Sequence, residues 1–126
     1  MTAVIVAAGR GSRLMNHHPK TMMNLDDRSI LEHIVTNLKQ AGVTKFVIVL
    51  GYQARMLQDF LLANDYFGLQ VQTVYNPDWQ RGNGISVLCA EELVGRQPFI
   101  LSMSDHIVSP TAVRRVLQAK DERNLL

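Results

Sequence analysis

Cysteine, long apolar runs and clustered basic residues are all scarce in this chain of 126 residues. Cys89 is the only cysteine, so no intrachain disulfide can form, which fits a reducing compartment such as the cytoplasm. No apolar run approaches the roughly 20 residues that a membrane-spanning helix needs, so we expect no direct membrane contact. The formal net charge is only +2, without a block of basic residues, and this argues against binding of nucleic acid.

Hydrophobic residues make up 47% of the chain, enough to bury the core of one domain over residues 1–126. Short apolar runs alternate with helical patterns, which is typical of an α/β fold with a parallel sheet and crossover helices. Gly42 should end the first helix, and Ser109 before a proline should cap the last. The expected strands are 2–8, 45–50, 70–75 and 98–103, and the expected helices are 29–41, 53–64, 84–94 and 110–124.

A glycine loop follows the first expected strand. Residues 4–6 form the continuous apolar run of a strand covered on both faces, and Gly9 and Gly11 then allow a sharp turn and close approach to a ligand. Arg13 adds a planar guanidinium that matches phosphate oxygens, and Lys20 adds a compact charge on a flexible stem. We therefore predict that this loop binds a polyphosphate.

Three other interpretations compete for the glycine loop. A dinucleotide fingerprint, as in NAD-dependent oxidoreductases, needs Gly-x-Gly-x-x-Gly, but Leu14 occupies the third glycine position. A P-loop needs Gly-Lys followed by Ser or Thr, and this tripeptide does not occur in the chain. A tight turn without a ligand stays open for a lone Gly-x-Gly, although the charges of Arg13 and Lys20 favour a phosphate.

The glycine loop and several later segments together resemble a known family. Residues 7–13 read Ala-Ala-Gly-Arg-Gly-Ser-Arg and residues 19–20 read Pro-Lys, which is similar to the signature of nucleotidyltransferases that join an NTP to a phosphorylated sugar or alcohol. The similarity extends over residues 23–25, 76–86 and 104–106. Asn-Pro-x-Trp, Gly-Asn-Gly-x-Ser and Asp-His most resemble the cytidylyltransferases for inositol 1-phosphate, with phosphocholine enzymes close behind.

The resemblance implies a Rossmann-like three-layer sandwich with a mainly parallel sheet, of the nucleotide-diphospho-sugar transferase type. The chain looks like the N-terminal, nucleotide-binding portion of such a domain, and exposed apolar surface on its open side would favour a homodimer. The implied enzyme uses Mg²⁺ and moves an NMP, here CMP from CTP, to a small phosphomonoester such as inositol 1-phosphate, releasing pyrophosphate. Two alternatives remain: a hexose-1-phosphate nucleotidyltransferase using another NTP, and a truncated, non-catalytic nucleotide-binding module.

The resemblance also assigns roles in handling the phosphates. It implies that Gly11, Ser12 and Arg13 hold the β- and γ-phosphates, with Arg13 stabilising the leaving group. Lys20 would bridge the α-phosphate and the incoming phosphate, offsetting the repulsion between two anions. Arg13 and Lys20 are therefore the expected catalytic residues.

The nucleoside and the metal are assigned in the same way. Asp105 would ligate Mg²⁺, a hard cation that takes carboxylate, phosphate and water oxygens, although a second carboxylate is missing. Gly82 and Asn83 would lie beside the base and ribose, and Asn76 is a weaker candidate. The full expected nucleotide-binding set is Ala7, Ala8, Gly9, Gly11, Ser12, Arg13, Lys20, Asn76, Gly82, Asn83 and Asp105, with Asp105 also as the metal ligand.

These residues should converge on one edge of the sheet. Ligands of open parallel sheets bind beyond the carboxyl ends of the strands. Four parts of the chain directly follow expected strands: the glycine loop, residues 51–53, the segment that begins at Asn76, and Asp105. Tyr52 and Trp79 belong to this edge, where their rings could stack on a base or acceptor, or wedge the loop against the sheet; the sequence favours neither.

Overall fold

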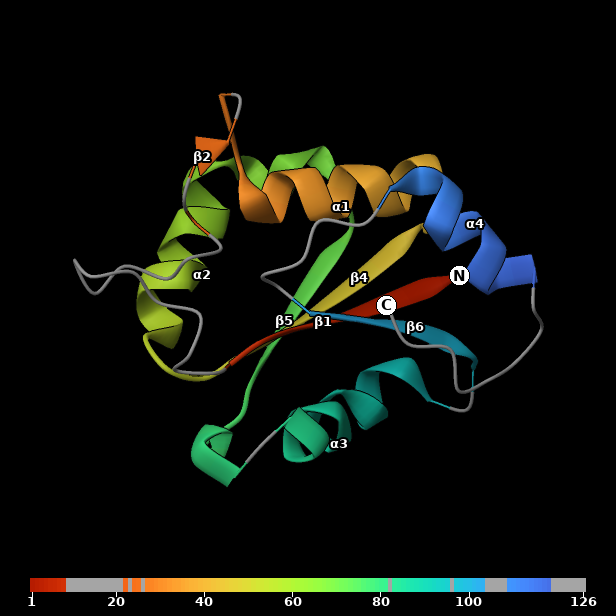
Figure 1. The fold of residues 1–126 in the computed structure, drawn as a ribbon. Helices are drawn as coiled ribbons and strands as arrows, with labels where there is room; N and C mark the ends of the chain where they lie inside the picture. The colour runs from red at the N-terminus through yellow and green to blue at the C-terminus, as the bar shows by residue number, and fades with distance from the viewer. Residues whose placement is uncertain are drawn as a thin grey trace.

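The computed structural model describes residues 1–8, 22, 24–25, 27–81, 83–95, 97–103 and 109–118. Its centre is a parallel sheet of four strands in the order β5-β4-β1-β6 (Figure 1). The strands lie close to where the apolar runs of the sequence predict them. Their bounds are Thr2–Ala7 for β1, Lys45–Leu50 for β4, Val71–Tyr75 for β5 and Phe99–Met103 for β6.

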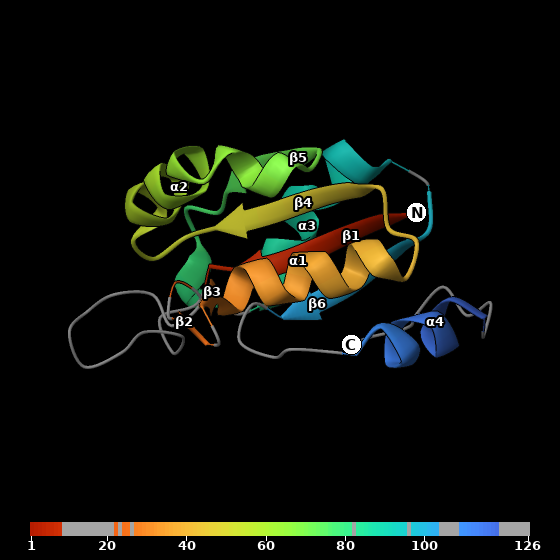
Figure 2. The ribbon, with the colours of Figure 1, turned by 90° about the horizontal axis from the view of Figure 1, so that it is seen from above.

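Helices cover both faces of this sheet, which confirms the three-layer α/β sandwich (Figure 1). The helices are α1 (Ile30–Gln40), α2 (Ala54–Ala63), α3 (Asn83–Val94) and α4 (Pro110–Gln118). Helices α1 and α2 lie over one face, with α2 toward β4 and β5 (Figure 2), and α3 lies over the opposite face. Residues 119–124, where the sequence predicts the end of the last helix, lie outside the described residues.

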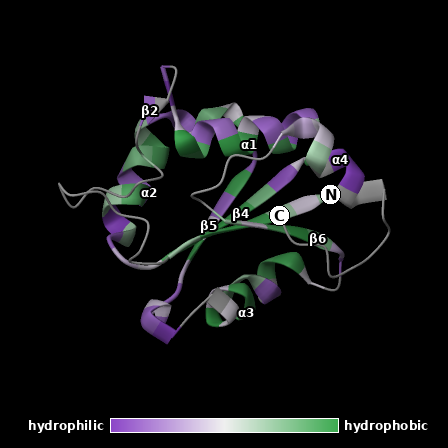
Figure 3. Cartoon of the chain, in the orientation of Figure 1, coloured by the Kyte–Doolittle hydropathy of each residue, from purple (hydrophilic) through white to green (hydrophobic). Residues whose placement is uncertain are grey.

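The alternation of side chains along β1 explains why the strand is apolar throughout. Ala3 and Ile5 pack into the core under α1 and α2, whereas Val4 packs into the core under α3. All three side chains are fully buried. A strand with both faces covered needs no polar alternation, so the sequence reads as a continuous apolar run. Figure 3 shows hydrophobic residues along the strands and on α3.

Local capping fixes the ends of the helices. Ser29 Oγ accepts a hydrogen bond of 3.1 Å from the main-chain N–H of Glu32 and so caps the start of α1. Gly42, with a φ of +111°, follows the end of α1 and donates its N–H to the Lys39 carbonyl. Ser109 Oγ accepts a 3.1 Å bond from the N–H of Ala112. The predictions for Gly42 and Ser109 are confirmed.

The sequence analysis missed four short elements. Strands β2 (Asn24–Leu25) and β3 (Arg28–Ser29) pair as an antiparallel ribbon ahead of α1. The 3₁₀ helices η3 (Asp65–Gly68) and η4 (Trp79–Arg81) follow α2 and β5. Elements of two to four residues are too short to show a period in the sequence. Among the helices that the structure describes, none has the length and apolar content to cross a membrane.

Candidate functional site at the carboxyl edge of the sheet

The carboxyl ends of β1, β4 and β5 meet at one edge of the sheet. In the parallel register, Ala7 pairs with Leu50 and Leu50 pairs with Tyr75. Just beyond these pairs, the N–H of Tyr52 donates to the Ala8 carbonyl at 2.9 Å, and the N–H of Asn76 donates to the Leu50 carbonyl at 2.7 Å. The segments after β4 and β5 are thus hydrogen-bonded to the strands beside them, next to the point where the glycine loop leaves β1.

Gly51 lies where three segments come closest together. A Cβ placed on Gly51 would lie 2.5 Å from Trp79 Cβ and 2.7 Å from both the Cβ and the carbonyl oxygen of Ala8. These distances are far inside ordinary van der Waals contact, so only glycine fits between the loop after β5 and the end of β1. The absence of a side chain at this position lets the two loops of the site pack directly against the strand.

Tyr52 and Trp79 pack on each other across the two loops. Their ring centroids lie 5.1 Å apart at an interplanar angle of 57°. Trp79 is also half-buried against the core cluster under α3. This arrangement supports the wedging role that the sequence analysis left open for Trp79, because the ring joins the loop after β5 to the turn after β4.

Asn76 is the buried polar residue at the start of the loop after β5. It is 0% exposed, and its Nδ2 donates a hydrogen bond of 2.9 Å to Ser86 Oγ in α3, a residue that is 1% exposed. Its Oδ1 accepts a bond of 2.8 Å from the N–H of Asp78. Both ends of the amide are therefore used within the chain, as a buried polar group requires.

Gln53 has an unusual backbone immediately before α2. Its φ of +56° and ψ of +37° place it in the left-handed region, and its side chain makes no cap for the helix. Its Oε1 is buried and has no hydrogen-bond partner within the part of the chain that the structure describes. Such strained conformations cluster at ligand sites, which supports a place for Gln53 at this edge, where the sequence predicts residues 51–53.

The structure places four of the expected site residues. Ala7 ends β1 and Ala8 follows it, almost fully buried beside Gly51. Asn76 lies at the same edge, and the backbone of Asn83 begins α3. The remaining expected residues lie outside the described part of the chain, and their roles stay predictions: Gly9, Gly11, Ser12, Arg13, Lys20, Gly82 and Asp105.

The described residues alone offer no metal centre. Within the ranges that the structure describes, no three His, Cys, Asp or Glu side chains gather closely enough to hold a metal ion. The expected Mg²⁺ ligand, Asp105, lies outside these ranges. The identity of Asp105 as a ligand therefore depends on its place after β6 and on the chemistry of its carboxylate, which suits Mg²⁺.

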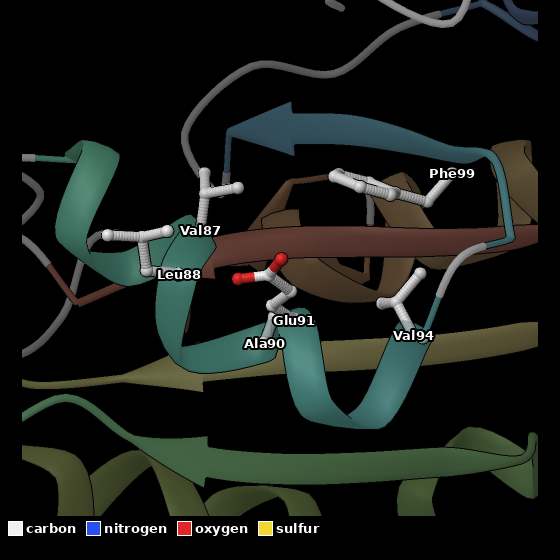
Figure 4. Close-up of a pocket in the computed structure, with 7 residues that line it drawn as sticks. Val87, Leu88, Ala90, Glu91, Val94 and Phe99 are labelled. Carbon is white, nitrogen blue, oxygen red and sulfur yellow. The ribbon is translucent and has the colours of Figure 1, made fainter.

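A separate hollow of about 220 Å³ lies between α3 and β6 (Figure 4). Its lining is largely apolar, and among the described lining residues Glu91 is the only one with a charged side chain. Phe99 is at the amino end of β6, opposite to the edge where ligands of parallel sheets bind. An apolar hollow with a carboxylate does not suit a phosphate, so it is not the candidate nucleotide site.

Fold and site together define an α/β domain whose candidate ligand edge is built from the ends of parallel strands. The MobA-like NTP transferase domain family matches residues 3–125, and the chain belongs to this family. This confirms the family resemblance that the glycine loop carries.

Three similar proteins show how the chain relates to its family. A bifunctional IPC transferase and DIPP synthase from Rubrobacter xylanophilus is 35% identical over 122 residues, which are 95% of this chain and 27% of that protein. A CTP:phosphoglutamine cytidylyltransferase from Campylobacter jejuni is 28% identical over 97% of this chain and 50% of its own length. The structure of the inositol-1-phosphate CTP transferase from T. maritima is 27% identical with a TM-score of 0.80, over 95% of this chain and 49% of that one. The chain thus spans half or less of these relatives.

Proposed function

We propose that this chain is the nucleotide-binding portion of a nucleotidyltransferase that moves CMP from CTP to a small phosphomonoester such as inositol 1-phosphate. The observation that carries the proposal is the agreement of sequence and fold. The family match covers residues 3–125, and the inositol-1-phosphate CTP transferase of T. maritima aligns with 95% of the chain at a TM-score of 0.80. The name of the CTP:phosphoglutamine cytidylyltransferase supports the same cytidylyl chemistry.

The reaction needs positioning and charge neutralisation more than covalent chemistry. A phosphate oxygen of the acceptor attacks the α-phosphorus of CTP, the bond from that phosphorus to the bridging oxygen breaks, and pyrophosphate leaves with the electron pair. In this proposal Lys20 neutralises the two phosphates that approach each other, and Arg13 stabilises the departing pyrophosphate. Asp105 would hold Mg²⁺, which neutralises phosphate charge when bound.

The described residues would supply the fixed frame for these groups. Gly51 lets the loop after β5 lie directly against the end of β1, where the glycine loop begins. The main-chain bond from Tyr52 to Ala8 fixes the turn after β4 at the same point. A ligand held between these loops would meet backbone that is already in place, so less binding energy is lost in ordering the site.

Calorimetric titration tests the proposal first. The chain is titrated with CTP, UTP, GTP, ATP and NAD, each with and without Mg²⁺. We expect a Mg²⁺-dependent preference for CTP. A preference for UTP or another NTP would keep the family and favour a hexose-1-phosphate acceptor, and binding of NAD without any NTP would overturn the proposal.

Turnover is measured as pyrophosphate release from CTP with inositol 1-phosphate, phosphocholine or glucose 1-phosphate as acceptor. Lys20→Ala should abolish this release while it preserves most of the affinity for CTP, because Lys20 acts on the approaching phosphates. Full turnover by Lys20→Ala would remove this residue from the mechanism. Binding of CTP without release of pyrophosphate from any of these acceptors would support the alternative of a non-catalytic nucleotide-binding module.

A further inference from the structure

A buried hydrogen bond closes the loop that leads from β5 into α3. Asn76 and Ser86 are ten residues apart, and neither has appreciable exposed surface. The bond from Asn76 Nδ2 to Ser86 Oγ joins the first residue after β5 to the first turns of α3. The intervening segment contains Gly82 and Asn83, the two residues expected beside the base and ribose.

The start of this loop is anchored to the sheet at two further points. The N–H of Asn76 donates to the Leu50 carbonyl at 2.7 Å, which continues the ladder between β4 and β5. Trp79 lies against Gly51 and Tyr52. The bond to Ser86 joins the far end of the loop to Asn76, so the two ends of the loop cannot move independently.

We infer that Asn76 and Ser86 are positioning residues for the nucleotide: their bond holds the start of α3, where the backbone of Asn83 lies, in register with the sheet edge. This inference rests on the proposed function. Asn76 has no exposed surface, and its amide already donates to Ser86 and accepts from Asp78. Its side chain therefore acts through the loop and does not touch the base.

Three variants test the inference: Asn76→Ala, Ser86→Ala and the double variant. We expect each single variant to raise the Kd for CTP roughly tenfold, since each removes the buried hydrogen bond between Asn76 and Ser86. Asn76→Ala also removes the bond from the N–H of Asp78. We also expect a reduced preference for CTP over UTP, because the residues beside the base lose their register. The double variant should raise the Kd little further, since both substitutions break the same bond.

Ser29→Ala is the matched control. Like Ser86→Ala, it removes a buried serine hydroxyl that accepts a hydrogen bond. The hydroxyl of Ser29 accepts from the N–H of Glu32 and lies at the start of α1, not in the loop before α3. We expect it to lower stability while leaving the Kd for CTP within twofold of the wild type. This separates positioning from a general loss of stability, which would affect all the single variants alike.

Trp79 supplies a second readout that needs no ligand, because it is the only tryptophan in the chain. Breaking the Asn76–Ser86 bond should loosen the loop and increase quenching of Trp79 fluorescence by acrylamide, whereas Ser29→Ala should not. If the wild-type chain bound no NTP, the proposed function would fail, and the quenching would still decide whether the bond positions the loop.

Two results would overturn the inference. Unchanged CTP affinity, CTP preference and Trp79 quenching in folded Asn76→Ala and Ser86→Ala would show that the bond contributes only to stability. Weaker CTP binding in Asn76→Ala with wild-type binding in Ser86→Ala would show that the bond between the two side chains does not position the nucleotide.

Discussion

Replacement of Gly51 by alanine tests whether the close approach of the site loops is a property of the folded chain. The new Cβ would lie 2.5 Å from Trp79 Cβ and 2.7 Å from the carbonyl oxygen of Ala8. Neither atom can move by a side-chain rotation, because one is a Cβ and the other belongs to the backbone of the segment after β1. The main chain of at least one of the three segments must therefore shift.

The magnitude follows from the number of rigid contacts. Overpacking a well-packed site costs about 1–3 kcal/mol, and three clashes below 3.0 Å at one atom place Gly51→Ala at the upper end of this range. For a domain of this size, each kcal/mol lowers Tm by roughly 4 °C. We therefore expect Gly51→Ala to lower the free energy of unfolding by about 3 kcal/mol and Tm by roughly 10 °C.

Urea unfolding followed by circular dichroism measures this loss, and two other glycines serve as controls. A Cβ on Gly84, in the first turn of α3, would meet nothing within 4 Å, so Gly84→Ala should stabilise the chain by up to about 1 kcal/mol through helix propensity. Gly95 has open space as well, but its φ is +69°, so Gly95→Ala should cost about 1–2 kcal/mol of backbone strain alone.

The comparison isolates the steric term. If Gly51→Ala unfolds within about 0.5 kcal/mol of the wild type, the range expected for an unremarkable surface substitution, the reasoning is refuted. A loss of stability no larger than that of Gly95→Ala would also contradict the reasoning, because backbone strain at a site without clashes would then cost as much as three clashes.

Three further substitutions probe the rest of the fold by the same unfolding measurement. Ser29→Ala removes the cap of α1 and should cost about 1 kcal/mol; no loss would show that the bond to Glu32 does not stabilise the helix. Arg28→Ala breaks an exposed ion pair with Glu32 at 3.9 Å, the one ion pair of Arg28 among the described residues. We therefore expect a change below about 0.5 kcal/mol, and a larger one would indicate an additional contact. Leu61→Ala leaves a cavity at a fully buried position of α2 and should cost about 2–5 kcal/mol. A cost below about 1 kcal/mol would mean that neighbouring side chains move to fill the cavity.

The parts of the fold that the sequence predicts are those with a strong local signal. The run Val4-Ile5-Val6 and the cap at Ser109 depend on residues close together in the sequence, and both lie where expected. The ribbon of β2 and β3 has two residues in each strand, and η3 contains positive φ values at Tyr66 and Phe67. Nothing in the local pattern predicts these, because neighbouring structure imposes them.

The residues of the candidate site also divide into those with a local signal in the sequence and those without one. The glycine loop and its two cations stand out because they form a motif, although Arg13 and Lys20 themselves lie outside the described residues. The constraint on Gly51 needs Ala8 and Trp79, which come from distant parts of the sequence and meet only in the folded sheet. The role of Ser86 could not be predicted either, since its partner reaches it around a loop rather than along a helix.

The pairing of β1 with β4 and β6 also has a consequence for how the chain is made. Synthesis begins at the N-terminus, yet Thr2 pairs with Lys45 on one side and with Phe99 on the other. During synthesis β1 thus leaves the ribosome before either of its neighbours, and it gains the second neighbour only once β6 has emerged. Until then an apolar strand stays open to other chains, and pairing over such distances in sequence is intrinsically slow. The nascent chain should therefore depend on a chaperone for as long as β6 is still in the ribosomal tunnel.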